Sequence, residues 1–173
     1  MRRWLAALAV ALVAVVAFYW LVVRDKTVEA TVEVPRLAAQ IGEGEDAVLV
    51  ASDGEVIRWG YRPQHLHLPA LPLSEAPKGG RLQGPALEQA EVLGAVPPAL
   101  RQYVASSRYG ESGVDVELTS GIELRFGDSS QAARKWKAAA AVLADRSVTA
   151  LSYVDLHAPG HAATGGEGHT LPE

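Results

Sequence analysis

The sequence has no cysteine and no asparagine, and it contains only two phenylalanines. Without cysteine the chain can form no disulfide, no thiolate zinc site and no cysteine nucleophile. Without asparagine it has no N-glycosylation site. Its 173 residues, 49% of them hydrophobic, suffice for one domain once a membrane segment is subtracted.

Basic residues are also too few and too scattered to indicate a nucleic-acid partner. The formal net charge is −4, and the part of the chain that follows Arg2 and Arg3 is more acidic still. A phosphate backbone is bound by clustered lysine and arginine, and no basic stripe is present. We therefore expect no nucleic acid among the partners.

Residues 4–23 form a hydrophobic run of 20 residues without a charge. As a helix this run would span about 30 Å, the thickness of a bilayer's hydrocarbon core. Arg2 and Arg3 precede it, so the positive-inside rule predicts a cytoplasmic N-terminus and an extracytoplasmic remainder. A cleaved signal peptide is the alternative, but the run is longer than a usual signal-peptide core. Three aromatic residues near its ends are expected at the membrane interfaces: Trp4, Tyr19 and Trp20.

Residues 121–156 show the pattern of a strand, a helix and a second strand. Apolar and charged residues alternate from Ile122 to Phe126, which predicts the first strand. Asp128 is expected to cap a helix beginning at Ser129, with Gln131 completing a capping box. The apolar stripe of that helix is expected to face the sheet, with Lys135 largely on another side: Ala132, Trp136, Ala139, Ala140 and Leu143. For Trp136 the phase favours a core position over a partner-facing one.

Two hairpins are predicted from the matching of apolar residues across short loops. Residues 47–59 turn at Ser52-Asp53-Gly54, which pairs Val50 with Val56 and Leu49 with Ile57. Residues 114–126 turn at Thr119-Ser120-Gly121. That loop pairs Leu118 with Ile122, Val116 with Leu124 and Val114 with Phe126, and it leaves a wet face on which Asp115 opposes Arg125 and Glu117 opposes Glu123.

The remaining segments are simpler. Residues 62–84 hold several prolines and a Gly-Gly pair, which predicts an extended passage without a helix. Pro85 can begin a helix that ends near Gly94, and the Pro97-Pro98 pair can begin a short helix reaching Val104.

Two clusters of polar residues are candidates for chemistry, and an interpretation without chemistry is favoured for each. His65 and His67 would share one side of a strand, but no third ligand follows at metal spacing, so exposed loop histidines are favoured over a zinc site. The other histidines available to such a site are His157, His161 and His169. The acids Asp115, Glu117 and Glu123 are explained by a half-exposed antiparallel sheet.

No nucleophile elbow and no phosphate-binding loop is present in the sequence. We therefore expect no catalytic residue, no metal, no cofactor and no small-molecule substrate. The segment 151–156 is expected to be the last strand, with an outer edge open to strand addition by another chain. Capping of that edge by the residues that follow is the alternative. Residues 159–173 are rich in glycine, proline and histidine, and we expect a tail that is disordered past Thr164.

An ordered set of residues within this region resembles the C-terminal β domain of the FtsQ/DivIB cell-division proteins. The set is Gly121, Phe126-Gly127, Lys135-Trp136 and the run Ser152-Tyr153-Val154-Asp155-Leu156, and the likeness extends more weakly back to Val32. The residue patterns above predict an α+β fold: one N-terminal transmembrane helix, then an extracytoplasmic antiparallel sheet domain with packed helices. The expected divisions are a cytoplasmic N-terminus (1–3), the membrane helix (4–23), a linker or remnant POTRA strand (24–40), the β domain (41–158) and the tail (159–173).

The resemblance also implies a non-enzymatic divisome scaffold that holds FtsB- and FtsL-type bitopic membrane proteins at the septum. In that family the partner adds a strand next to the final strands, at and after the YVDL run. Carried onto this sequence, the partner-binding residues are Tyr153, Val154, Asp155, Leu156, His157 and Ala158. The family often has arginine where His157 stands, and an imidazole could replace the salt bridge of that arginine at low pH.

Family members normally carry a small POTRA domain between the membrane helix and the β domain, and this chain has no room for it. An internal deletion, a misread gene or a divergent short form would each produce that arrangement. A truncated or degenerate relative without a divisome role therefore stays open as an alternative. A membrane-anchored hydrolase or metal-binding module is a more distant one.

Overall fold

The computed structural model describes residues 36–42, 44, 47–58, 67–158 and 160–170. The predicted membrane helix, its aromatic residues Trp4, Tyr19 and Trp20, His65 and most of the 24–40 segment lie outside these residues. Within the described part of the chain, no helix has the length and hydrophobicity needed to cross a bilayer.

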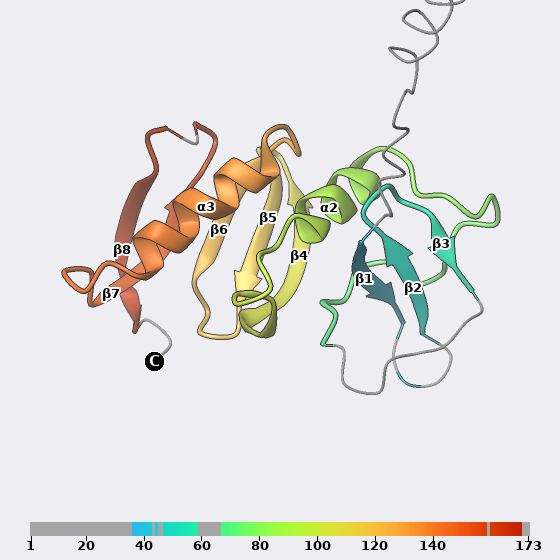
Figure 1. The fold of residues 1–173 in the computed structure, drawn as a ribbon, viewed down its shortest axis with the longest axis horizontal. Coiled ribbons are helices and arrows are strands. Elements are labelled where there is room, and N and C mark those ends of the chain that lie inside the picture. Colours follow the sequence, from blue (N-terminus) through green and yellow to red (C-terminus); the bar gives the residue numbers. More distant parts are fainter. Residues whose placement is uncertain (1–35, 43, 45–46, 59–66, 159, 171–173) are drawn as a thin grey trace, which may run out of the picture. The chain divides into compact units, whose positions relative to one another are not determined.

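The described residues form two sheets and two α-helices (Figure 1). The first sheet has the order β1-β2-β3, and the second has the order β4-β5-β6-β7-β8. The elements in chain order are β1 (Leu37–Ile41), β2 (Val48–Ala51), β3 (Val56–Ile57), α2 (Pro85–Gly94), the 3₁₀ helix η2 (Arg101–Tyr103), β4 (Val104–Gly110), β5 (Gly113–Leu118), β6 (Glu123–Gly127), α3 (Ala132–Leu143), β7 (Ala150–Asp155) and β8 (Ala163–Thr170).

The fold is α+β, as predicted, but the second sheet is mixed rather than antiparallel. Strands β6 and β7 are parallel, with Leu124 opposite Val154, and the other neighbouring strands are antiparallel. The physical reason is the connection, because α3 returns the chain across the sheet so that β7 runs in the direction of β6.

An extended segment around Ala70 links the two sheets. Ala70 forms parallel bridges with Gln40 of β1 and with Ser106 of β4. On the β1 side, the Gln40 amide donates to the Pro69 carbonyl at 3.0 Å, and the Leu71 amide donates to the Gln40 carbonyl at 2.8 Å. The proline-rich passage therefore acts as a short strand between the sheets. The described residues 67–84 contain no helix, as predicted.

The first predicted hairpin is confirmed in its register. Strands β2 and β3 place Leu49 opposite Ile57 and Val50 opposite Val56. The turn closes through the Gly54 amide, which donates to the Ala51 carbonyl at 2.9 Å. Gly54 has a φ of 82°, the left-handed conformation for which glycine was predicted there.

The second predicted hairpin is confirmed over most of its length and wrong at one pair. Val116 lies opposite Leu124, Asp115 opposite Arg125 and Glu117 opposite Glu123, as predicted. Val114 lies opposite Gly127 instead of Phe126, because a bulge places one extra residue in β6. The predicted inner face is nevertheless buried, since Val114, Phe126 and their neighbours on it are at most 2% exposed.

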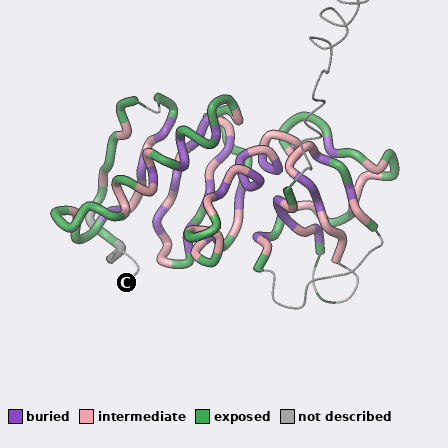
Figure 2. Tube along the Cα trace, in the orientation of Figure 1, coloured by how far each residue is buried: buried purple, intermediate pink, exposed green. Residues whose placement is uncertain are grey.

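Both helices pack on one face of the strands, and the core lies between them and the sheets (Figures 1 and 2). Helix α2 has the predicted bounds. Trp136 of α3 is fully buried, as its phase predicted, with its ring centroid 4.9 Å from that of Phe126. Its indole N–H donates to the Val92 carbonyl at 2.8 Å, which joins α3 to α2.

Helix α3 begins three residues later than predicted. Its N-cap is Gln131, which has a left-handed φ of 55° and makes no side-chain cap. The predicted capping box is therefore wrong. The Asp128 carboxylate instead accepts the Ser130 amide and hydroxyl and the Lys135 ammonium, so residues 128–131 form a turn before the helix.

Two strands, β4 and β8, were not predicted as such, and β1 lies at the end of the 24–40 segment that was predicted as a linker or a remnant POTRA strand. The segment expected as a helix up to Val104 is the single turn η2, after which β4 begins at Val104. Ser107 of β4 is buried and donates from its hydroxyl to Gln89 of α2 at 2.9 Å. This buried polar pair fixes α2 on the sheet.

Candidate interaction site at the carboxy-terminal sheet edge

Strand β7, predicted as the last strand with a free edge, lies between two neighbours. β6 pairs with it on one side and β8 on the other. Tyr153 faces Glu123 across the first pairing and Gly165 across the second. The prediction of an open β7 edge is therefore wrong, and the alternative of capping by the residues that follow is correct. Residues 163–170, expected as a tail disordered past Thr164, form the covering strand.

The predicted partner-binding residues differ in their access to solvent. Val154 and Leu156 are fully buried on the helix side of the sheet. Tyr153 and Asp155 are half-buried on the opposite face, and His157 and Ala158 are exposed where the chain leaves β7. Side chains of this segment can therefore reach a partner only from the polar face and from the β7–β8 connection.

The outer edge of β8 is the exposed counterpart of the edge predicted for β7. Among the described residues, no segment pairs with that outer edge. The far side of β3, at the other end of the fold, is covered: the Val56 amide donates to the Gly80 carbonyl at 2.9 Å, and the Leu82 amide donates to the Gly54 carbonyl at 2.8 Å. An open edge offers main-chain donors and acceptors to another chain.

Strand β8 follows β7 closely because glycines stand where β7 side chains pack. A Cβ atom on Gly165 would lie 2.5 Å from the Tyr153 hydroxyl, and one on Gly166 would lie 2.4 Å from the Ser152 hydroxyl. The pairing shifts register between Leu151 and Tyr153, at this same place. At its glycines, β8 therefore contributes only main-chain groups to the contact with β7.

Charged side chains cover the polar face of β4 to β7. Arg125 lies with its guanidinium carbon 4.0 Å from the centre of the Tyr153 ring, a cation–π contact. Its Nε also donates to Glu123 at 2.5 Å, and Arg108 of β4 binds the other oxygen of the same carboxylate. Burial alone would raise the pKa of Glu123, but the hydrogen bonds from the two arginines outweigh it and lower that pKa.

Asp115 belongs to the same ion network but responds in the opposite sense. Its carboxylate lies 3.4 Å from Arg108. Burial, followed by repulsion from Glu123, raises the pKa of Asp115 despite the nearby arginines. The like-charge pair Glu117–Glu123 is relieved by Arg125, as predicted, and also by Arg108 from the next strand.

Lys135 anchors the turn between β6 and α3 from inside the fold. Its side chain is 2% exposed, and its ammonium group donates to the Phe126 carbonyl at 2.8 Å, the Asp128 carbonyl at 2.9 Å and the Asp128 carboxylate at 2.7 Å. This contact, followed by the hydrogen bond from Ser130, lowers the pKa of Asp128. The prediction that Lys135 points away from the core is wrong, because three acceptors in the turn compensate its burial.

His157 lies on the main chain of Gly127. A Cβ atom on Gly127 would be 2.5 Å from the imidazole Cδ2, so only glycine leaves room for the ring. One ring nitrogen, Nδ1, is 2.8 Å from Asp155 Oδ1, and the other, Nε2, is 3.2 Å from the Ser112 carbonyl. The hydrogen bond to Asp155 raises the pKa of His157, against an opposing effect of burial.

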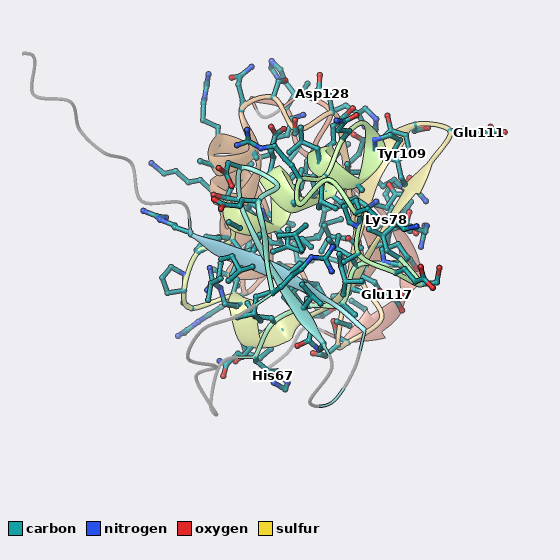
Figure 3. All side chains as sticks on the ribbon, turned by 90° about the vertical axis from the view of Figure 1, so that its right-hand side faces the viewer. His67, Lys78, Tyr109, Glu111, Glu117 and Asp128 are labelled. Carbon is teal, nitrogen blue, oxygen red and sulfur yellow. The ribbon has the colours of Figure 1, made fainter. Side chains whose placement is uncertain are left out.

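The candidates for metal and carboxylate chemistry do not converge in the described residues. No group of three or more histidine, aspartate or glutamate side chains there could hold a metal ion. His67 is exposed and lies apart from Glu117, as Figure 3 shows. Of the three acids considered as a carboxylate site, Glu123 forms salt bridges with Arg108 and Arg125, and Asp115 forms one with Arg108.

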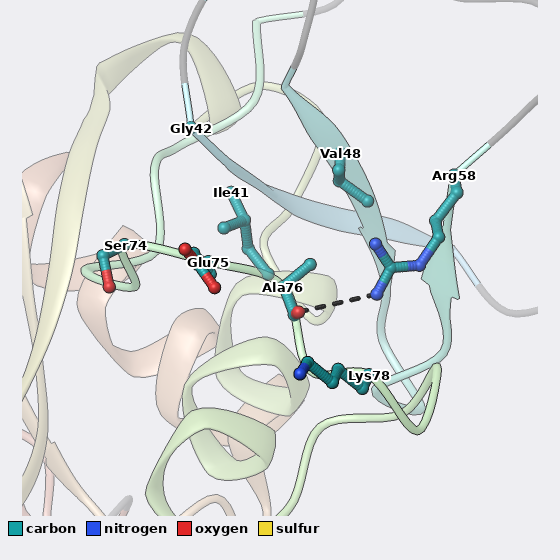
Figure 4. Close-up of a pocket in the computed structure, with 8 residues that line it drawn as sticks. All are labelled: Ile41, Gly42, Val48, Arg58, Ser74, Glu75, Ala76 and Lys78. Atoms are coloured by element: carbon teal, nitrogen blue, oxygen red, sulfur yellow. Dashed lines mark hydrogen bonds between the residues drawn. The ribbon is translucent and has the colours of Figure 1, made fainter.

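An open pocket of about 610 Å³ lies at the first sheet (Figure 4). Arg58 spans one side and donates to the Pro77 carbonyl at 2.7 Å. Its remaining lining mixes apolar and charged residues without a nucleophile–base pair: Ile41, Gly42, Val48, Ser74, Glu75, Ala76 and Lys78. Nothing in this lining indicates a reaction.

Sequence reasoning missed two features of the site. Strand β8 lacks the apolar alternation that marks a strand, because its neighbour provides the side chains that pack there. The niche for His157 depends on Gly127, whose φ of 69° could not be inferred from alternation. The one available signal was the density of glycines at 165, 166 and 168, which suits a strand in close contact with its neighbour.

Two comparisons with known proteins bear on the identity of the chain. A search of curated proteins found no match. A protein-family model described as "Cell division protein FtsQ/DivIB, C-terminal" matches residues 39–157, from within β1 to two residues past β7. Because this match covers more than half of the chain, the protein belongs to the FtsQ/DivIB family of cell division proteins.

Proposed function

We propose that this protein is a non-enzymatic scaffold of the division septum that binds FtsB- or FtsL-type membrane proteins by strand addition at the outer edge of β8. The family gives the role in cell division. The observation that carries the finer proposal is the unpaired outer edge of β8 within the described residues, at the end of a five-stranded sheet. Strand addition gains affinity from main-chain hydrogen bonds and tolerates varied side chains.

The segment from Tyr153 to Ala158 acts in this proposal mainly by carrying β8. Val154 and Leu156 hold β7 in the core, and Tyr153 packs against Gly165 of β8. His157 and Ala158, exposed at the start of the β7–β8 connection, are the members of the segment whose side chains can meet a partner beside the added strand.

Residues 4–23 serve in the proposal as an uncleaved membrane anchor, with Trp4, Tyr19 and Trp20 at the interfaces and the N-terminus in the cytoplasm. The two arginines before the run support that orientation. The β domain then lies outside the cytoplasm, on the same side of the membrane as the extracytoplasmic segment of a bitopic partner.

A pair of proline substitutions tests the strand-addition site. In an antiparallel edge strand, successive N–H groups point alternately toward the neighbouring strand and outward. Of Ala163→Pro and Thr164→Pro, one therefore removes an N–H that holds β8 on β7, and the other removes an N–H available to a partner.

The experiment measures the melting temperature of each full-length variant in detergent and its capture of the extracytoplasmic segment of an FtsB-like protein. We expect the variant that keeps the wild-type melting temperature to lose at least tenfold in affinity. Lys78→Pro, in the exposed loop far along the chain from β8, serves as the control for proline itself. Unchanged capture by both β8 variants would refute strand addition at this edge.

A further inference from the structure

We propose that His157 is a pH-dependent clamp that fixes the β7–β8 hairpin to the β4–β5 turn when its imidazole is doubly protonated, and thereby regulates the β8 edge. This inference rests on the proposed function for its biological consequence. The clamp itself rests on the contacts of the ring.

The two ring nitrogens of His157 face two groups that can only accept hydrogen bonds. Nδ1 lies 2.8 Å from a carboxylate oxygen of Asp155, and Nε2 lies 3.2 Å from the main-chain carbonyl of Ser112. A neutral imidazole carries one N–H and can donate to only one of them, whereas an imidazolium donates to both. Both contacts are satisfied together only in the charged form.

Deprotonation should release the contact to Ser112 rather than the contact to Asp155. The carboxylate is the stronger acceptor and is held in place by the His157 main-chain amide, which donates to the same oxygen at 3.0 Å. The remaining Nε2 lone pair would then face the lone pairs of the Ser112 carbonyl. The ring loses its link to the β4–β5 turn and keeps its link within β7.

The charges around the ring favour its protonated form on balance. Asp155 on β7 and Asp115 on β5 are the acidic groups that interact with it, while Lys135 on α3 opposes its charge. Arg125 on β6 acts on Asp155 rather than on the ring itself. A folded-state pKa above that of a free histidine means that the clamp contributes fully below about pH 6.5 and is lost as pH rises through the folded value.

The clamp lies where it can influence β8. Asp155, its first partner, is opposite Ala163, the first residue of β8, and His157 begins the connection between the two strands. The ring rests on Gly127, so the connection is held against β6 as well as against the β4–β5 turn. Loosening it frees the end of the hairpin from the rest of the sheet.

Hydrogen–deuterium exchange of residues 157–170 in the full-length protein tests the clamp without any partner. After correction for intrinsic rates, we expect exchange to be roughly two- to tenfold faster at pH 8.5 than at pH 6, the effect of one net hydrogen bond. His157→Gln should abolish this pH dependence. His157→Arg, permanently charged, should keep the slow rate at both pH values.

His161→Gln removes an exposed histidine of the same connection and should leave the pH dependence unchanged. As a second measurement, the NMR titration of His157 in the wild-type protein should give a pKa above about 6.5. A pH dependence that survives His157→Gln, or a pKa at or below that of a free histidine, would overturn the clamp. A partner that never binds would refute the proposed scaffold and leave the exchange result standing, so the two failures are distinguishable.

Discussion

Lys135 shows how a single charged residue can hold a turn from within. Its ammonium group serves two main-chain carbonyls and the Asp128 carboxylate while its side chain is 2% exposed. Lys135→Met preserves the shape of the stem and leaves those carbonyls without a donor. We expect it to lower the free energy of unfolding by about 1–3 kcal/mol, measured by urea denaturation.

Lys137→Met, on the exposed side of the same helix, is the matched control and should change stability by less than about 0.5 kcal/mol. The effect should also depend on acidity. Lys135 is the first cause of the lowered pKa of Asp128, so the stabilisation is present above about pH 4 and is lost as pH falls through the folded value. If Lys135→Met and Lys137→Met changed the free energy of unfolding equally at pH 7, the hydrogen bonds of the buried ammonium group would not contribute to stability.

Gly127 is the second residue whose identity is imposed by its surroundings. Its φ is 69°, and the imidazole of His157 occupies the space where a side chain would begin. Gly127→Ala should therefore lower the free energy of unfolding by about 1–2 kcal/mol from backbone strain alone, with the displaced ring adding to the loss. Thermal melting of the full-length protein measures the change.

Gly79→Ala is a suitable comparison, because a Cβ atom at Gly79 would meet no atom within 4 Å. It should leave the melting temperature nearly unchanged. If both alanine variants melt together, the niche described for His157 is not occupied by the ring.

At this scale the sequence predicted apolar residues better than polar ones. Trp136 was placed in the core by its phase on the helix, and burial follows directly from that phase. The same reasoning wrongly placed Lys135 outside the core. The hydrogen bonds that compensate the burial of its charge come from acceptors in the turn after β6, and the sequence pattern does not reveal the shape of that turn. Gln89 was missed in the same way, since its partner Ser107 lies on a strand that was not predicted.

Among the elements, β8 depends most on its neighbour. Its pairing with β7 requires glycine at 165 beneath the Tyr153 ring. Gly165→Val should push β8 away from β7, and we expect limited proteolysis to cut the variant after residue 160 at least several-fold faster than the wild-type protein. Gly160→Val, in the connection and with open space around it, should not change the cleavage rate. Equal rates would mean that glycine at 165 has no part in holding the strand.

An element could be predicted when the residues that determine it are close together in the sequence. Hairpin β2–β3 was predicted in register because its turn residues and its apolar pairs are adjacent in sequence. The bulge at Phe126 was not predicted. It lies next to Gly127, which is in close contact with Gly113 and His157, and alternation within one strand does not reveal such contacts. Strand β8 is recognised only once its neighbour β7 is in place.

For the whole molecule, the proposed anchor and its orientation give a prediction in cells. A reporter active only outside the cytoplasm, fused after residue 173, should be active, because the arginines before residues 4–23 favour a cytoplasmic N-terminus. The same reporter fused after Arg3 should be inactive. Activity of a strictly cytoplasmic reporter at the C-terminal end would reverse the orientation.

The family and the α+β class were recognisable from the sequence because the strand–helix–strand of residues 121–156 keeps its pattern in an ordered set of residues. The outer edge of the second sheet was not predicted correctly. The outermost strand of the sheet is β8 and not β7. The sequence did not indicate this, because a glycine-rich strand lacks the apolar alternation by which strands are predicted.

The central claim is that a partner adds a strand at the outer edge of β8. Amide-resolved hydrogen exchange on addition of a partner tests it most directly. The extracytoplasmic segment of an FtsB-like protein is added to the full-length chain in detergent. Strand addition predicts new protection at alternate amides within residues 163–170 and none along β3, whose far side is already covered. Protection that is absent from β8, or that appears only at other strands while the partner is bound, would contradict the account.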